Sequence, residues 1–322
     1  MMSLKSVLGA ACVVLVSAVV SMGASAQNPR VLMDTDLGPL ILELDPARAP
    51  ATVTNFLAYV DRGDYNNTVF HRIVPDFVAQ AGITRENGSS IQQRAPVASE
   101  RGNGLLNRRG TVAMALSALG NQYNYTSATS SFFFNTVDNP ELDPDFTVFG
   151  RVVSGIENLD AIASTARYVN TTTPIRAPLI RRAVRVSDFP ILELHTGAWF
   201  DPARSGRGFS VEIADGGGSG AQPLIIVYWY DYFEGEQVWM NGVAQFNWGD
   251  SEVEIPLGIT RGAQWGADFD PADVERAGDW GTLTVRFESC ARGRFSYRSA
   301  FGDGELELQR LTRPVGARCS EP

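Results

Sequence analysis

Residues 65–82 constrain the fold more than any other stretch of this 322-residue chain. The stretch opens on two asparagines and then becomes apolar. Pro75-Asp76 interrupts the apolar run and predicts a turn, because proline pre-sets the first turn angle and aspartate hydrogen-bonds its own backbone. Residues 70–73 before the turn and residues 77–80 after it are typical of two short strands. Arg72 and Gln80 lie on these neighbouring strands, each inside an apolar run. A charge in such a place is costly unless it is paired or faces a site, so we expect a site here.

This stretch resembles the signature of the cyclophilin family of peptidyl-prolyl cis–trans isomerases. The signature is Tyr, two residues, Ser or Thr, one residue, then Phe-His-Arg and an aliphatic pair, and residues 65–74 match every fixed position. Residues 110–115, 130–135 and 148–152 resemble later motifs of the family, in family order. The resemblance extends over residues 30–188.

Short strand-like runs dominate this part of the chain. Residues 31–35 and 40–44 are two such runs, and apolar residues alternate along the second. Apolar residues at helical spacing after Pro50 predict one helix that ends before Gly63, and residues 156–163 predict another. Many short strands with two helices favour a closed barrel. The resemblance implies a mainly β fold, an eight-stranded antiparallel β-barrel with two helices.

The chemistry that the resemblance implies breaks no bond. Rotation about a peptide bond meets a barrier of about 18–20 kcal/mol, and the enzyme must favour the twisted amide over both planar forms. A fixed cationic donor can bond the lone pair that the prolyl nitrogen gains. The resemblance assigns this catalytic role to Arg72, with Gln80 orienting Arg72 or bonding the substrate backbone, and implies no metal and no cofactor. It also implies six substrate-binding residues, namely Phe77, Val78, Ala115, Phe133, Leu142 and Phe146.

The residues by themselves leave other interpretations open. Without the motif, the apolar members of this set would be plain barrel core, and Arg72 would belong to a structural ion pair. The sequence also departs from the family pattern. Glu141 stands where Trp or Phe is usual on the pocket rim, and Ser131 stands where Gln is usual. Phe146 replaces His or Tyr, and Leu116 replaces a polar residue. These departures favour, as an alternative, a proline-peptide binding module with weakened catalysis.

Other polar residues of this half predict no further chemistry. His71 has no cysteine or second histidine nearby, which favours a packed structural role over that of a base or metal ligand. Four carboxylates within residues 138–145 lack the spacing and central glycine of an EF-hand, so we expect a solvated loop. Residues 83–109 and 119–129 are polar loops of a length that is usually functional or mobile. The resemblance places such loops at the rim of the substrate groove.

Residues 1–26 are predicted to be a signal peptide. Lys5 precedes an apolar run that is too short to span a bilayer comfortably, and Ala24-Ser25-Ala26 is typical of a cleavage site. We therefore expect an exported protein, periplasmic or else secreted. The net charge is −9, and cleavage would make it more negative by removing the only lysine. A negatively charged protein is not expected to bind nucleic acid or anionic membranes. Cys290 and Cys319 would remain as a pair in an oxidising compartment, which predicts a disulfide; two reduced cysteines are the alternative.

The composition changes at Asp188, and all six tryptophans lie beyond it. Aromatic and β-branched runs at residues 224–230 and 281–287 predict strands, so residues 189–322 are expected to form a second all-β barrel or sandwich after the cyclophilin-like part, residues 27–188. Residues 198–209 resemble an accessory β module of exported bacterial proteins. The tryptophans could form a stacking platform for glycans or peptides, although burial in a core is the favoured interpretation.

The sequence as a whole predicts a peptidyl-prolyl isomerase that assists the folding of exported proteins. Its expected partners are proline-containing polypeptides, and the second all-β part could contact envelope material or glycans. An envelope- or glycan-binding protein is accordingly the second alternative. The sequence predicts no oligomeric state.

Overall fold

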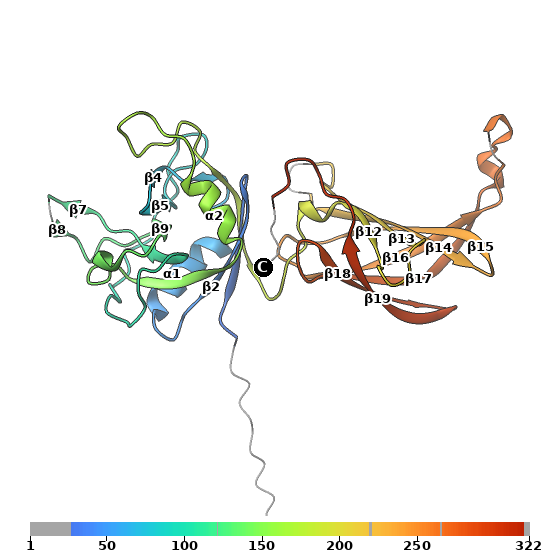
Figure 1. The fold of residues 1–322 in the computed structure, drawn as a ribbon, viewed down its shortest axis with the longest axis horizontal. Coiled ribbons are helices and arrows are strands. Elements are labelled where there is room, and N and C mark those ends of the chain that lie inside the picture. Colours follow the sequence, from blue (N-terminus) through green and yellow to red (C-terminus); the bar gives the residue numbers. More distant parts are fainter. Residues whose placement is uncertain (1–26, 121, 219–220, 265, 319–322) are drawn as a thin grey trace, which may run out of the picture.

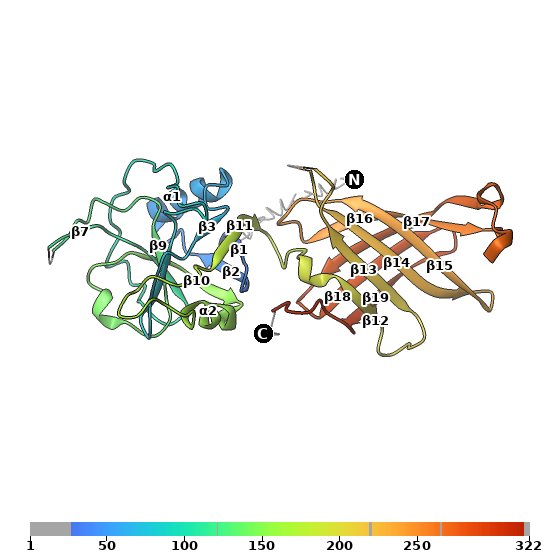
Figure 2. The same ribbon diagram turned by 90° about the horizontal axis from the view of Figure 1, so that it is seen from above.

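The structure is a computed structural model that describes residues 27–120, 122–218, 221–264 and 266–318, with only the backbone described for 276–279. Two bodies, a curled sheet with two α-helices and a closed barrel, lie side by side along the long axis (Figures 1 and 2). The predicted signal peptide, residues 1–26, lies outside the described residues. So does Cys319, whose predicted partner Cys290 is buried; signal peptide and disulfide therefore stay predictions.

The first body is a nine-stranded antiparallel sheet in the order β3-β11-β1-β2-β10-β6-β9-β5-β4 within the described ranges. Its strands are β1 Arg30–Thr35, β2 Gly38–Leu44, β3 Thr68–Val69, β4 Arg72–Val74, β5 Val78–Ala81, β6 Thr111–Met114, β9 Phe132–Asn135, β10 Val148–Ser154 and β11 Leu179–Val186. The two edge strands, β3 and β4, are separated in the chain only by Phe70 and His71, so the sheet curls until its edges meet.

The expected run of residues 70–73 as one strand is therefore wrong in detail. Residues 68–69 pair with β11, whereas residues 72–74 pair with β5 at the other edge. The chain must leave one partner before it reaches the next, which divides one barrel strand into two short ones. With β3 and β4 counted as one strand, the predicted eight-stranded barrel fold is confirmed. Two further strands, β7 Ala118–Leu119 and β8 Gln122–Tyr123, form a separate hairpin.

Two α-helices occur in the described part of the chain, α1 Pro50–Asp61 and α2 Ile156–Ala163. Pro50 is the first residue of α1, where the N–H that proline lacks would have no partner within the helix. A side chain distant in sequence accepts the next N–H groups of the helix N-terminus. The Glu100 carboxylate accepts the backbone N–H groups of Ala51 and Thr52, each at 2.9 Å. This contact ties the polar loop of residues 83–109 to the helix N-terminus. No described helix has both the length and the apolar character needed to cross a membrane.

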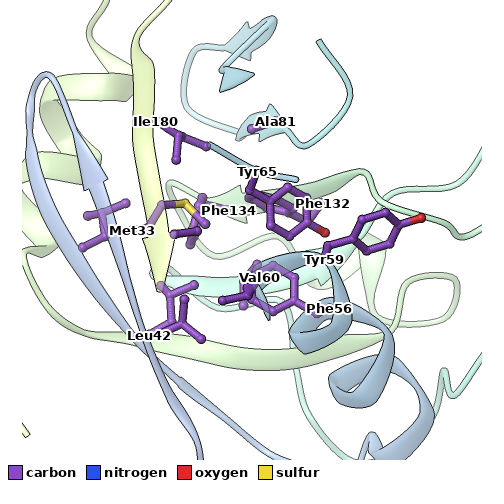
Figure 3. Close-up of a cluster of buried hydrophobic side chains, with 14 of the residues drawn as sticks. Met33, Leu42, Phe56, Tyr59, Val60, Tyr65, Ala81, Phe132, Phe134 and Ile180 are labelled. Atoms are coloured by element: carbon purple, nitrogen blue, oxygen red, sulfur yellow. The ribbon is translucent and has the colours of Figure 1, made fainter. Parts of the chain in front are cut away.

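The inner face of the curled sheet and one side of α1 enclose an aromatic core. Phe56 of α1 lies 5.2 Å from Tyr65 and 5.5 Å from Phe132 between ring centroids. Figure 3 shows these rings beside Phe134 and the aliphatic residues around them. Tyr65, the first residue of the sequence motif, is fully buried and donates its hydroxyl to the Ser130 carbonyl at 2.9 Å. The motif tyrosine is therefore a structural residue that fixes the start of β9.

The second body is a closed antiparallel barrel of eight strands within the described residues, so the barrel alternative is confirmed over the sandwich. Its strands follow chain order as β12 Gly197–Phe200, β13 Gly208–Ala214, β14 Leu224–Phe233, β15 Glu236–Gln245, β16 Glu252–Arg261, β17 Glu275–Phe287, β18 Arg292–Ser299 and β19 Gly302–Arg310. β12 pairs with β19 and closes the barrel. Trp199 and Trp229 are buried in its core, Trp248 and Trp280 are half-buried, and Trp239 is exposed.

Side chains join the two bodies. The Arg182 guanidinium of β11 lies 3.6 Å from the ring centroid of Trp248 in the barrel. The same guanidinium pairs with Asp34 at 3.4 Å and Glu193 at 2.8 Å. A small buried apolar cluster lies beside this contact and contains Leu32, Ile41, Val186 and Leu192. A half-buried cation stacked on tryptophan, next to packed aliphatic side chains, resists separation of the two bodies.

His195 makes the stability of the barrel depend on pH. Its ring is fully buried and stacks on Phe287 at 3.7 Å between centroids, and its Nδ1 accepts the Leu192 N–H at 3.1 Å. Burial, followed by the charge of Arg310, lowers the pKa of His195 well below its ordinary value. The unfolded chain binds a proton below about pH 6.5 that the folded barrel does not bind. The free energy of unfolding should therefore fall as pH drops below about 6.5, by up to about 1.4 kcal/mol per pH unit from this group.

This pH dependence can be measured by urea unfolding followed by tryptophan fluorescence, which reports on the barrel because all tryptophans lie beyond residue 188. His195→Gln cannot titrate in this range. Between pH 6.5 and 5, the free energy of unfolding of this variant should therefore change with pH less steeply than that of the native protein, by up to about 1.4 kcal/mol per pH unit, which corresponds to one proton. An identical pH slope in the native protein and in His195→Gln would contradict the assignment, whatever the absolute stability of the variant.

Candidate active site

A second apolar cluster lies on the outer face of the curled sheet. Phe133 of β9 is paired with Gln80 of β5 on one side and with Ala113 of β6 on the other. Side chains alternate between the faces of a strand, so Phe132 and Phe134 enter the inner core while Phe133 points to the opposite face. The outer cluster is separate from the inner core and consists of Val78, Ala113, Phe133, Leu142, Phe146 and Val148. These residues are therefore buried in a cluster of their own and do not belong to the inner barrel core.

The cluster residues on the strands form the floor of a cavity, and residues of a 3₁₀-helix and of the loop after it form the cavity wall. The 3₁₀-helix η1, Pro140–Leu142, places Leu142 over the strands, and the loop that follows places Phe146 there. The ring of Phe146 meets Phe133 edge to face, with centroids 5.3 Å apart and planes at 84°. Edge-to-face is one of the two preferred arrangements of aromatic pairs, and this contact holds Phe146 against Phe133.

The floor and wall enclose a cavity of ≈ 260 Å³. This volume falls below the range of about 300–1,000 Å³ that holds whole drug-sized ligands, so it suits one residue of a polypeptide with part of its neighbours. The cavity is lined by Arg72, Phe77, Val78, Gln80, Ala115, Leu116, Tyr123, Phe133, Leu142 and Phe146. All eight site residues expected from the sequence are brought together here. Tyr123 was missed, since its only signal was an aromatic residue within a polar loop.

Arg72 and Gln80 face each other across the β4–β5 hairpin, in direct register. Asp76 turns the chain between them with a positive φ of 48°, a conformation that aspartate tolerates better than most residues. Arg72 Nη1 donates to Gln80 Oε1 over 3.4 Å, a long contact. Within the described ranges no carboxylate lies at ion-pairing distance from Arg72. Arg72 therefore makes no structural ion pair with a described residue, and its guanidinium keeps N–H donors available at the cavity.

Ser131 holds the Gln80 amide in one orientation. Gln80 Nε2 donates to Ser131 Oγ at 3.2 Å, and the Ser131 hydroxyl donates to the Ala81 carbonyl at 3.1 Å. Because the amide nitrogen is engaged by Ser131, the amide oxygen faces Arg72. A polar chain therefore runs from the backbone of β5 to the guanidinium. Sequence reasoning noted Ser131 only as a departure and missed this role.

The remaining polar residues of the motif region lie outside the cavity. His71 is not among the lining residues, and burial lowers the pKa of its imidazole, which keeps it neutral near pH 7. Glu141 is exposed on η1 and does not line the cavity either. Asp138 pairs with Arg108 at 2.9 Å, so the expected loop is fastened as well as solvated. Within the described part of the chain, no group of three or more His, Cys, Asp or Glu residues could hold a metal ion.

The fold and the site together consist of a curled antiparallel sheet with an arginine beside an apolar cavity on its outer face. A family model described as cyclophilin-type peptidyl-prolyl cis-trans isomerase/CLD matches residues 30–185. A peptidyl-prolyl cis-trans isomerase of Acinetobacter baylyi is 41% identical over 142 residues, which cover 42% of this chain and 73% of the relative. Peptidyl-prolyl cis-trans isomerase B of Escherichia coli is 36% identical over 144 residues, covering 42% and 85%.

A solved structure is also similar. A crystal structure of a cyclophilin-type isomerase from Cryptosporidium parvum, determined in the presence of the dipeptide Ala-Pro, matches 49% of this chain and 99% of its own, with 26% identity and a TM-score of 0.42. On the family model and the curated relatives, the chain belongs to the cyclophilin-type peptidyl-prolyl cis–trans isomerase family. Residues 30–185 are its isomerase domain.

Proposed function

We propose that the protein is exported and isomerises X-Pro bonds in exported polypeptides, with Arg72 as the group that stabilises the twisted amide. The observation that carries the proposal is the Arg72 guanidinium, which lines an apolar cavity and has no described carboxylate partner. The prolyl ring would occupy the cavity against Phe133, Phe146 and Leu142. The signal-like features of residues 1–26 support export.

The chemistry follows from what changes during rotation. As the amide twists, conjugation is lost and the prolyl nitrogen gains a lone pair, so a hydrogen bond from a guanidinium is stronger in the twisted state than in either planar state. The apolar cavity strengthens that bond by excluding water. Gln80 limits the freedom of Arg72 before the substrate arrives. The domain needs no nucleophile and no proton transfer for this reaction.

A refolding assay tests the activity on polypeptides. A protein whose slow refolding phase is limited by a non-native X-Pro bond should refold faster in the presence of catalytic amounts of the purified chain. An unchanged slow phase, at concentrations where the chain is folded, would leave a proline-peptide binding module as the better assignment. Cell fractionation tests the export: the chain should be found in the periplasm or the medium, and retention in the cytoplasm would contradict that part of the proposal.

One observation favours a second function for the barrel. Trp239 of β15 is paired with Tyr230 of β14, and both side chains are about half exposed on the outer wall. Tyr232 is exposed two residues further along the same strand face. We propose that this aromatic row stacks on sugar rings of envelope material. The full chain should then be retained on peptidoglycan or another envelope glycan, and Trp239→Ala should lose retention while keeping isomerase activity. No retention of the native chain on any envelope polymer would refute this function.

Removal of the Ser131 hydroxyl should weaken catalysis without abolishing it. Ser131→Ala frees the Gln80 amide to rotate and lose its contact with Arg72, and one such hydrogen bond contributes about 0.5–1.5 kcal/mol. We expect kcat/KM for an X-Pro peptide to fall by about two- to tenfold. Ser131→Thr keeps the hydroxyl and should retain most of the activity. Equal losses in both variants would indicate a packing defect and contradict the positioning role.

A further inference from the structure

The β7–β8 hairpin supplies the cavity with an aromatic residue that lies outside the barrel strands. Tyr123 of β8 packs on Phe146, with ring centroids 4.7 Å apart and planes at 68°. Phe146 packs in turn on Phe133. The three rings form a continuous wall that rises from the floor of the cavity to its rim. Tyr123 remains 38% exposed, so part of its ring is free at the mouth of the cavity.

Contacts at the base hold the hairpin in this place. The Asn124 N–H donates to the Ser117 carbonyl at 2.9 Å, and the Ser117 N–H donates to Ser127 Oγ at 2.8 Å. The Tyr125 hydroxyl donates to Asp145 Oδ1 at 2.5 Å. Asp145 directly precedes Phe146, so the hairpin is fastened to the loop that carries the cavity wall.

Arg101 contacts the ring face of Tyr125 and so helps to hold this tyrosine in place. The Arg101 guanidinium lies 4.1 Å from the centroid of the Tyr125 ring, and its Nη1 donates to the Pro144 carbonyl at 3.0 Å. Tyr125 is therefore held by a hydrogen bond at its hydroxyl and by a cation over its face. Tyr123, two residues away on a two-residue strand, has little freedom to leave the wall.

We propose that Tyr123 is a specificity-determining residue that selects X-Pro segments with an aromatic or large aliphatic residue beside the proline. This inference rests on the proposed isomerase function. With the proline ring in the cavity, the neighbouring substrate residue lies at the rim, where the free part of the Tyr123 ring offers apolar surface. A large apolar side chain would gain an aromatic contact there, whereas alanine would leave the ring exposed. The preferred substrates are therefore unfolded segments whose prolines lie in apolar stretches.

The test measures two quantities on one set of peptides by NMR: affinity from titration and isomerisation rate from cis–trans exchange. The peptides carry phenylalanine, leucine or alanine beside the proline, before it or after it. We expect the native chain to favour the phenylalanine or leucine peptide over the alanine peptide by about three- to tenfold, the magnitude of one aromatic contact. Tyr123→Ala should remove this preference, and Tyr123→Phe should keep it because the ring makes the contact.

Two matched variants sharpen the result. Leu119→Ala changes a 77% exposed residue of the same hairpin that does not line the cavity, and it should leave the preference unchanged. Tyr125→Phe removes the anchoring hydroxyl and should reduce the preference in part. The proposal would be overturned if the preference for the phenylalanine or leucine peptide persisted in Tyr123→Ala. It would also be overturned if Tyr123→Ala lowered affinity and rate equally for every peptide. If the native chain exchanges no peptide at all, the isomerase function fails, and the ratio of affinities still decides the role of Tyr123.

Discussion

Arg72→Ala is expected to lower kcat/KM for an X-Pro peptide by about 10²- to 10³-fold, the usual cost of removing one preorganised donor to a transition state. The guanidinium would bond the prolyl nitrogen only in the twisted state, so its loss should fall mainly on kcat. The apolar cavity remains intact in this variant. Peptide affinity should therefore change by much less than the rate, and both can be measured by the same NMR exchange and titration experiment.

Two controls separate this role from a general effect of charge. Arg72→Lys keeps a cation but offers a compact ammonium in place of the planar fork, so it should recover only part of the activity. Arg48→Ala removes an exposed arginine whose ion-pairing partner is Asp45, at 3.7 Å, and it should leave kcat/KM unchanged. A loss below threefold in Arg72→Ala would show that another group stabilises the transition state.

Phe56→Ala should destabilise the isomerase domain by about 3–5 kcal/mol, the usual cost of truncating a fully buried phenylalanine. Phe56 is 0% exposed and its ring lies 5.1 Å from Phe149, 5.2 Å from Tyr65 and 5.5 Å from Phe132. Its removal would leave a cavity between α1 and the inner face of the sheet, which close-packed neighbours can only partly fill. Urea unfolding followed by far-ultraviolet circular dichroism measures this loss.

Tryptophan fluorescence provides an internal control, because it reports on the barrel and should shift little in Phe56→Ala. Phe56→Leu keeps most of the apolar volume and should cost less than about 1.5 kcal/mol. Leu119→Ala, at an exposed position, should stay within about 0.5 kcal/mol of the native protein. A loss below about 1 kcal/mol in Phe56→Ala would contradict the packing of the aromatic core.

Local features of the fold could be predicted because they depend on neighbouring residues. The hairpin of Arg72 and Gln80 follows from a Pro-Asp turn between two apolar runs, and the predicted second helix coincides with α2. The eight site residues could be named because the motif resembles a known family. The barrel could not be chosen over the sandwich, since closure depends on the pairing of β12 with β19, more than 100 residues apart.

Features that join distant segments escaped prediction for the same reason. Nothing local to Glu100 indicates that its carboxylate caps α1. Ser131 looks like a loss of the usual residue until its hydroxyl is seen beside Gln80. Glu141 stands where the resembled family usually has an aromatic residue and does not line the cavity, whereas Tyr123 supplies an aromatic ring to the cavity from a different segment. The division of Phe132, Phe133 and Phe134 between two faces could be expected from strand periodicity, but which face held a cavity could not.

The most direct test of the catalytic role is cis–trans exchange of a short X-Pro peptide, measured by NMR with catalytic amounts of the purified chain. We expect exchange cross-peaks between the cis and trans forms with the native chain and catalysed exchange that is about 10²- to 10³-fold slower with Arg72→Ala at the same protein concentration, while both proteins bind the peptide. Binding by the folded native chain without accelerated exchange would contradict the isomerase function and leave the groove as a binding site for proline-containing segments.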